Sequence, residues 1–381
     1  MKKIALKIAY IGTNFHGFQR QPNLRTIEGE LIYTLKKLGY IDDLKKSKFQ
    51  IAGRTDKGVH SLGNVISFIT DKEVLINQIN HKLPYDIQIL AKTPVRYGFR
   101  PRYALMRYYR YMFFEENLDI SAMEELSKLF LGEHDFTNFS KRDQKTPVRK
   151  IDNINIIVPK NKINRDIIKY KPIMGQSIKY KLEKNKKIAI GNYDESICRN
   201  LAIDDYDESI SRNVAINDEE SINKKVASQD FDESVSRDVA IDENNESMNL
   251  SKEFLQFNQQ RMDNFNSIFV DVYGESFLWN MIRKMMRIFL LVGKNKMDVE
   301  EVEKFFNPKE KFNIKPLESE NLILMDTSYN NINFKYDDYA CERFRRYLID
   351  NLFNYKMNHS IENNILNSME KILSNVNYLK P

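Results

Sequence analysis

The sequence predicts an α+β fold that begins with a ferredoxin-like unit, in which strands and helices follow in the order β-α-β-β-α-β. Runs rich in β-branched and aromatic residues alternate with segments whose apolar residues recur at helical spacing. After the first unit this alternation repeats more loosely, up to about residue 326. The chain has 381 residues, 42% of them hydrophobic, which suits two domains or one large composite with a substantial core.

The first part of the chain contains strands and helices in regular alternation. Strands are predicted over residues 2–10, 49–52, 65–69, 87–93 and 107–114. Helices are predicted over residues 26–39, 73–83 and 121–131. Thr26 is the expected N-cap of the first helix, Pro84 follows the second, and Gly132 closes the third.

The second part contains fewer elements and one unusual segment. Strands are predicted over residues 151–158, 267–273 and 322–326, and helices over 278–292 and 298–306. Three near-copies of an acidic sequence begin at Tyr193, Tyr206 and Phe231. Their irregular spacing does not suit stacked repeats, and their Ser/Asn-rich composition predicts a flexible surface insertion over about residues 161–262. A role in a protein contact is the alternative for this insertion.

These elements divide the chain into four parts. Residues 1–115 form the predicted N-terminal α/β half, and residues 116–160 together with 263–330 form the C-terminal α/β half. The acidic insertion at 161–262 interrupts the second half. Residues 331–381 are predicted to be a C-terminal helical extension.

Charge is distributed unevenly along the chain. The formal net charge is +6, but residues 193–250 contain sixteen acidic and five basic residues, a net charge of −11. The rest of the chain must then carry +17, which is typical of a protein that binds nucleic acid. A solvated, lysine-rich surface without a nucleic-acid partner is the alternative.

Cysteine, histidine and hydropathy patterns exclude several classes of protein. Cys198 and Cys341 are far apart, and the five histidines form no cluster, so we expect no disulfide framework, metal site or metal cofactor. No apolar run reaches about 18 residues, so neither a transmembrane helix nor a membrane partner is expected. The lysine-rich start is too charged for a signal peptide. We therefore expect a cytoplasmic protein.

One short segment carries most of the chemical information. Residues 52–60 read Ala-Gly-Arg-Thr-Asp-Lys-Gly-Val-His, between two predicted strands. Gly53 and Gly58 indicate a tight turn with positive φ, and Asp56 lies at its middle between Arg54 and a lysine. A carboxylate flanked by cations on a rigid turn suits a nucleophile or base that acts on an anionic substrate. The alternative is an aspartate that only hydrogen-bonds its own turn.

This segment resembles the active-site motif of the TruA-type tRNA pseudouridine synthases, Ala-Gly-Arg-Thr-Asp-x-Gly-Val-His, and matches every fixed position. Residues 10–21 are similar to the family's opening Tyr-x-Gly-x-x-Tyr/Phe-x-Gly-x-Gln-x-Gln. Residues 107–111 are similar to its Lys/Arg-x-Tyr-x-Tyr strand, and residues 277–283 to its Phe-x-x-x-Met-Val-Arg helix start. The family has a glycine where this chain has Asn321. Because asparagine tolerates positive φ, we expect the turn there to survive.

The resemblance implies roles for individual residues. Asp56 would be the catalytic carboxylate, Arg283 would pair with it, and Tyr109 would stack under the target base and is a candidate for removing the proton from C5. With Tyr109, the residues expected to contact the substrate are Arg54, Thr55, His60, Phe15, Gln19 and Arg149. From the residues alone, Tyr109 and Phe15 also fit core packing. Arg283 also fits an exposed basic face with Lys284 and Arg287.

As a whole, the resemblance implies a cofactor-free isomerase that converts uridines 38, 39 and 40 of the tRNA anticodon stem-loop into pseudouridine. It implies two ferredoxin-like halves forming one mainly antiparallel sheet flanked by helices, with a basic central cleft, and a homodimer. Asp56 would either attack C1′ or deprotonate C2′, and the sequence leaves both routes open. The alternatives are a non-catalytic RNA-binding protein resembling RRM domains, and an aspartate-based hydrolase. The sequence contains no second catalytic carboxylate motif, which speaks against the hydrolase.

Overall fold

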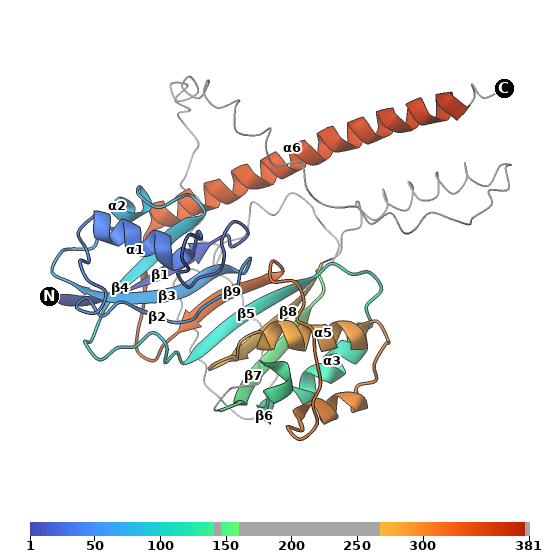
Figure 1. The fold of residues 1–381 in the computed structure, drawn as a ribbon, viewed down its shortest axis with the longest axis horizontal. Helices are drawn as coiled ribbons and strands as arrows, with labels where there is room; N and C mark the ends of the chain where they lie inside the picture. Colours follow the sequence, from blue (N-terminus) through green and yellow to red (C-terminus); the bar gives the residue numbers. More distant parts are fainter. Residues whose placement is uncertain (141–145, 160–266, 378–381) are drawn as a thin grey trace, which may run out of the picture. The chain divides into compact units, whose positions relative to one another are not determined.

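The computed structural model describes residues 1–140, 146–159 and 267–377 (Figure 1). The three acidic repeats, Cys198 and the predicted insertion at 161–262 lie outside the described residues. The described chain is a mixed α+β fold built on one ten-stranded sheet with flanking helices. One pair among the described strands is parallel and the others are antiparallel. The predicted α+β class with a mainly antiparallel sheet is therefore confirmed.

The sheet contains every strand that the sequence predicts and two more. The strands are β1 Lys2–Tyr10, β2 Gln50–Ile51, β3 His60–Thr70, β4 Ile87–Val95, β5 Met106–Phe113, β6 Gly132–Asp135, β7 Val148–Ile157, β8 Ile268–Gly274, β9 Leu322–Ser328 and β10 Lys335–Tyr336. Nine of them follow the order β10-β4-β1-β3-β9-β5-β8-β7-β6, and β2 pairs with β3. The additional strands are β6, whose Gly-Glu-His-Asp sequence has no strand pattern, and β10, which has two residues.

The helices also follow the predicted order. They are α1 Ile27–Lys37, α2 Ile76–Asn80, α3 Ile120–Leu129, α5 Met281–Gly293 and α6 Asp338–Asn377. Thr26 caps α1 as predicted, because its hydroxyl accepts a hydrogen bond from the Gly29 amide at 3.3 Å. The predicted helix at 73–83 is shorter than expected, and residues Glu300–Phe306 form a 3-10 helix. No described helix is both long and apolar enough to cross a membrane.

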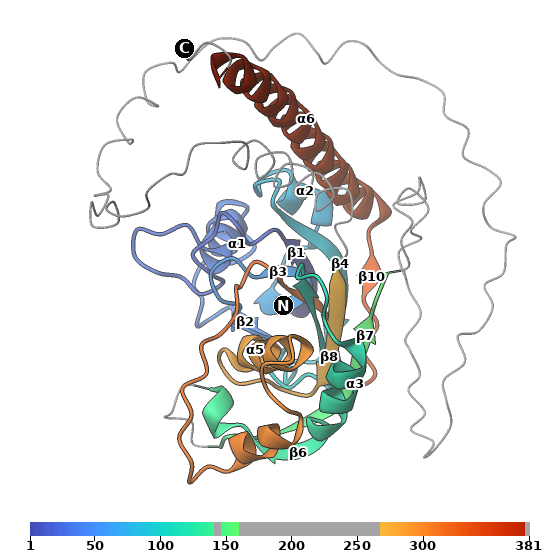
Figure 2. The same ribbon diagram turned by 90° about the vertical axis from the view of Figure 1, so that its right-hand side faces the viewer.

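Two apolar cores lie on the helix-covered face of the sheet. Near β1, Leu6 and Ile8 pack with Leu31 of α1. Near β8, Val270 packs with Phe289 of α5. Figure 2 shows α1 and α5 on the same side of the sheet. The first core belongs to the strands around β1 and the second to the strands around β8, so the sheet consists of two groups of strands.

Strands β3 and β9 join these two groups. His60 pairs with Ile323, and Ser61 with Leu324, in parallel register. The turn over residues 53–59 leads directly into β3. It therefore lies where the two groups of strands meet.

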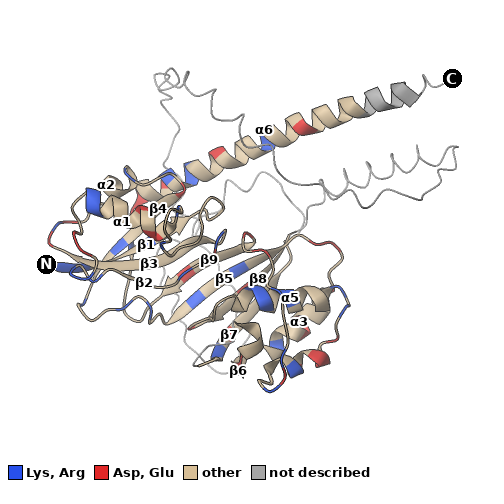
Figure 3. Ribbon diagram, viewed as in Figure 1, with Lys and Arg blue, Asp and Glu red and all other residues tan. Residues whose placement is uncertain are grey.

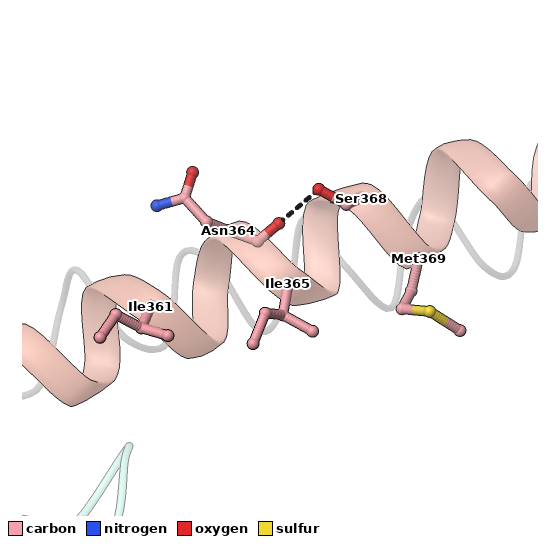
Figure 4. A pocket seen from close by; sticks show the side chains of 5 residues that line it. All are labelled: Ile361, Asn364, Ile365, Ser368 and Met369. Carbon is pink, nitrogen blue, oxygen red and sulfur yellow. Dashed lines mark hydrogen bonds between the residues drawn. The ribbon is translucent and has the colours of Figure 1, made fainter.

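Helix α6 differs from the other helices because little of it is covered. Near its start, Ala340 and Phe344 are buried against the sheet. Farther along, large apolar side chains are exposed, among them Ile361, Ile365 and Met369 (Figure 4). The outer part of α6, residues 352–369, thus contributes no side chain to the described cores.

Candidate active site

The 53–59 turn is held from below by two fully buried polar residues. The Asn64 side-chain amide donates to the Gly53 carbonyl at 3.0 Å and to the Tyr10 hydroxyl at 3.1 Å. The Tyr10 hydroxyl also lies 2.9 Å from the Thr55 hydroxyl. Because these groups are removed from water, each of them needs its partner. The network therefore fixes the height of the turn above the sheet.

The loop after β1 holds the same turn from the other side. The Phe18 amide donates to the Thr55 carbonyl at 3.0 Å. A Cβ atom on Gly12 would lie 2.1 Å from the Val59 carbonyl oxygen, so the two backbones are in direct contact. Within the turn, Gly58 has a φ of +83°, as expected, but Gly53 is not among the residues with positive φ. The expectation of left-handed backbone at Gly53 is therefore wrong.

His60 extends this support to the segment before β9. Its Nδ1 accepts from the Gly12 amide at 3.0 Å, and its Nε2 lies 3.0 Å from the Glu320 carbonyl oxygen. These partners fix the neutral ring with the proton on Nε2. Burial lowers the pKa of His60 below its ordinary value of 6.5. The polar side-chain atoms of His60 and of the buried Thr55 thus bond to Gly12, Glu320 and Tyr10, which surround the turn.

Asp56 receives one donor on each carboxylate oxygen. Arg283 Nη1 lies 3.2 Å from Oδ2, and Trp279 Nε1 lies 2.8 Å from Oδ1. Both donors come from the segment that starts α5, more than 200 residues from the turn. The side chain of Asp56 keeps 25% of its surface exposed, so a substrate can reach it.

Arg283 points into this site rather than onto an exposed face. Its Nε donates to the Leu317 carbonyl at 2.6 Å, its Nη1 also reaches Asn280 Oδ1 at 3.2 Å, and its side chain is 16% exposed. Lys284 and Arg287 instead donate to backbone carbonyls elsewhere. The structure thus brings Arg283 and Asp56 together, which separates Arg283 from its two basic neighbours.

Tyr109 lies on the same face of the sheet as this pair. Its ring meets Phe277 edge-on, with the centroids 5.3 Å apart. Burial raises the pKa of Tyr109 to about 12, the Asp56 charge adds to this, and the Arg107 charge opposes it. The hydroxyl is therefore protonated at neutral pH. Because side chains alternate along a strand, Tyr108 and Arg110 lie on the other face, where both bind Asp271.

The remaining predicted site residues are more scattered. Arg54 and Gln19 are exposed. Phe15 is 1% exposed and packs in the core, with the Arg25 guanidinium 4.0 Å above its ring. Arg149 is half-buried at the start of β7 and donates to the carbonyls of two neighbouring residues. In the described part of the chain, Phe15, Gln19 and Arg149 make no hydrogen bond or ion pair with Asp56.

The segment before β9 closes the site from above. A Cβ atom on Gly58 would lie 2.8 Å from Glu320 Cγ, so this segment touches the turn. Asn321 is not among the residues with positive φ, and its carbonyl accepts from the Met112 amide at 3.0 Å. The expectation that Asn321 needs a tolerance for positive φ is therefore wrong, and an ordinary backbone explains why asparagine fits there.

Sequence reasoning missed three residues of this arrangement. They are Trp279, Asn64 and Tyr10, which support Asp56 or its turn. One signal was available, because Trp279 is the only tryptophan in the chain. Asn64 gave no such signal, since its strand also contains His60, Ser67 and Thr70. Figure 3 shows the basic residues that the chain places on β5 and α5, which border the site.

Comparison with known proteins identifies the family to which the chain belongs. Residues 229–330 match the family model described as tRNA pseudouridine synthase. The chain is 45% identical to tRNA pseudouridine synthase A of Methanobrevibacter smithii, over 98% of this chain and 99% of the relative. It is 34% identical to the protein of that name from Methanothermobacter thermautotrophicus, over 90% of this chain and 88% of the relative. For the protein of that name from Pyrococcus horikoshii the identity is 30%, over 90% and 91%. The chain therefore belongs to the tRNA pseudouridine synthase family of isomerases.

Proposed function

We propose that Asp56 is the catalytic carboxylate with which this tRNA pseudouridine synthase isomerises uridine, and that its targets are uridines 38, 39 and 40 of the anticodon stem-loop. The observation that carries the proposal is the pair of donors on Asp56, Arg283 on one oxygen and Trp279 on the other. An aspartate that served only its own turn would bond nearby backbone amides. Here the carboxylate is bound by two side chains from the distant segment around the start of α5, and it stays accessible.

The proposed reaction begins when the target nucleotide leaves the helical stack and enters the site. Asp56 then breaks the C1′–N1 bond, either by attacking C1′ or by removing the proton at C2′. The freed uracil rotates and rejoins C1′ through C5, which displaces Asp56 from C1′ in the first route and is accompanied by return of the proton to C2′ in the second. In both routes the proton lost from C5 is balanced by the one gained at N1. Reactant and product are isomers, so the net reaction consumes no oxidant or reductant.

Other residues have supporting roles in this proposal. Arg283 stabilises the carboxylate by charge. Tyr109 holds the base with a protonated hydroxyl, because its raised pKa disfavours the phenolate that a direct base would need. The exposed Arg54 guides the flipped nucleotide or fills the space it leaves.

Residues farther from Asp56 act on the RNA or on the turn. Gln19 and Arg149 contact the RNA backbone in this proposal. Thr55 and His60 contribute by holding the turn, since their polar atoms bond to the chain itself. Phe15 contributes through the packing of the loop that contains it.

We propose further that the fold consists of two ferredoxin-like halves around a basic cleft. Strand order supports this division. When the short β6 is left out and strands are numbered within each half, β4-β1-β3-β2 and β9-β5-β8-β7 both have the order 4-1-3-2. Because β5 lies between β9 and β8, we place the boundary between β4 and β5 instead of at residue 115. The C-terminal extension from residue 331 follows the second half. The family resemblance also suggests a homodimer that acts in the cytoplasm.

Pseudouridine mapping by mass spectrometry tests the proposal. Unmodified tRNA transcripts are incubated with the wild-type protein, with Asp56→Asn, and with Asp71→Asn as a control that makes the same charge change at an exposed site. We expect modification at positions 38–40 with the wild type and the control. Asp56→Asn should lower the rate by at least about 10³-fold while tRNA binding persists. Binding without product from the wild type would support the RNA-binding alternative, and release of free uracil would support a hydrolase.

A further inference from the structure

We propose that Trp279 is a positioning residue for Asp56, which fixes the orientation of the carboxylate without adding charge. The proposal rests on the proposed function, in which Asp56 reacts with the nucleotide. The indole Nε1 lies 2.8 Å from Oδ1 of Asp56, which is a short distance for a hydrogen bond from nitrogen to oxygen. Trp279 is the only tryptophan of the chain, so no other indole offers this contact.

Two donors on different oxygens restrict the carboxylate more than one donor does. With Arg283 alone on Oδ2, rotation of the carboxylate about its Cβ–Cγ bond would disturb only one hydrogen bond. The indole on Oδ1 sets the plane of the carboxylate. A carboxylate has about four lone-pair sites, so about two remain for the substrate. The orientation of these free lone pairs decides which sugar atom Asp56 can reach.

The indole is 51% exposed, and buried residues anchor the segment that carries it on both sides. Leu278 on one side is 7% exposed, and Met281 on the other side is fully buried. Asn280 between Trp279 and the helix has a φ of +61°, a conformation that asparagine tolerates better than most residues. The Asn280 side chain also accepts from Arg283 at 3.2 Å. One short segment thus places both donors of Asp56.

The two donors differ in what they supply. Arg283 supplies a positive charge beside Oδ2 of Asp56. Trp279 is a neutral donor and adds direction only. Removal of the indole N–H should therefore lower kcat and leave tRNA affinity almost unchanged.

Variants of Trp279 test this role in the full chain with unmodified tRNA. Trp279→Phe keeps an aromatic ring but removes the donor. We expect its kcat to fall about 10- to 100-fold, the usual range for one lost hydrogen bond to a charged group, with KM within about threefold of wild type. Trp279→His, which keeps a ring N–H, should recover part of the loss. Tyr103→Phe, at an exposed tyrosine, is the matched control and should leave both constants unchanged.

The outcomes separate this inference from the proposed function. A wild-type protein that forms no pseudouridine would contradict the proposed function itself. An active wild type with an unchanged kcat in Trp279→Phe would overturn the positioning role, as would a loss confined to KM, which would make the indole a stacking surface for RNA.

Fluorescence provides a second test that leaves Trp279 in place. Because the chain has one tryptophan, its emission reports on this position alone. Asp56→Ala should change the emission intensity or wavelength, since it removes the carboxylate bound to the indole. Asp71→Ala should have no such effect. Unchanged emission in Asp56→Ala would contradict the contact on which the proposal rests.

Discussion

The 53–59 turn and the outer part of α6 differ in regularity and in support. The turn has no repeating backbone pattern, yet buried groups of Tyr10 and Asn64 bind it from below, and the loop after β1 binds it from the side. Helix α6 is fully regular, yet side chains such as Phe353 and Ile361 are more than half exposed. Buried hydrogen-bond partners, and not regular secondary structure, therefore fix the position of a functional segment such as this turn.

Substitution of Gly12 by alanine should have the largest effect on the turn. The added Cβ would lie 2.1 Å from a backbone oxygen of Val59, so one of the two backbones must move. We expect a loss of about 3 kcal/mol or more in the free energy of unfolding, measured in urea, together with loss of activity. Gly98→Ala is the matched control, because no atom lies within 4 Å of its added Cβ. Equal stability of the two variants would show that the loop is not in firm contact with the turn.

Asn64→Ala should have the next largest effect. The change leaves the partly buried Gly53 carbonyl and the buried Val65 amide without their side-chain partner. We expect a loss of about 2 kcal/mol in the free energy of unfolding, with a lower kcat because the turn is no longer held at its height. Asn364→Ala, at an exposed position of α6, should change stability by less than about 0.5 kcal/mol. If the two variants were equally stable, burial of the partners would not explain the rigidity of the turn.

The sequence predicted much of this molecule because local signals agreed. Runs of β-branched and aromatic residues located strands such as β5, and the cap at Thr26 located the start of α1. The string around Asp56 identified the turn through its resemblance to a family motif. Each of these signals lies within a few neighbouring residues, where backbone propensity and side-chain period decide the outcome.

The contacts that sequence could not supply join distant residues. Trp279 and Asp56 are 223 positions apart, and a tryptophan before a helix fits many roles. The short β6 was missed because its strand character comes from pairing with β7 and not from its own polar sequence. Gly53 shows the opposite error, since a glycine in a turn suggested positive φ where the backbone does not need it. Tertiary packing decides all three cases.

The smallest expected effect concerns pH and His60. Its Nδ1 accepts from the Gly12 amide, so protonation there breaks that hydrogen bond, and burial lowers its pKa below the 6.5 of an unfolded chain. The unfolded state then binds more protons than the folded state below about pH 6.5. The contribution of His60 to stability is therefore complete above this pH and decreases as the pH falls toward the lowered pKa.

Urea unfolding of the wild type and His60→Gln between pH 7.5 and pH 5 measures this contribution. We expect the wild type to lose more stability than the variant on acidification, so that the gap between them narrows. His359→Gln, on the exposed part of α6, should follow the wild type at every pH. A constant gap between wild type and His60→Gln would mean that His60 can be protonated without cost to the turn. The hydrogen bond from the Gly12 amide to His60 would then add nothing to the support that this turn has and the exposed helix lacks.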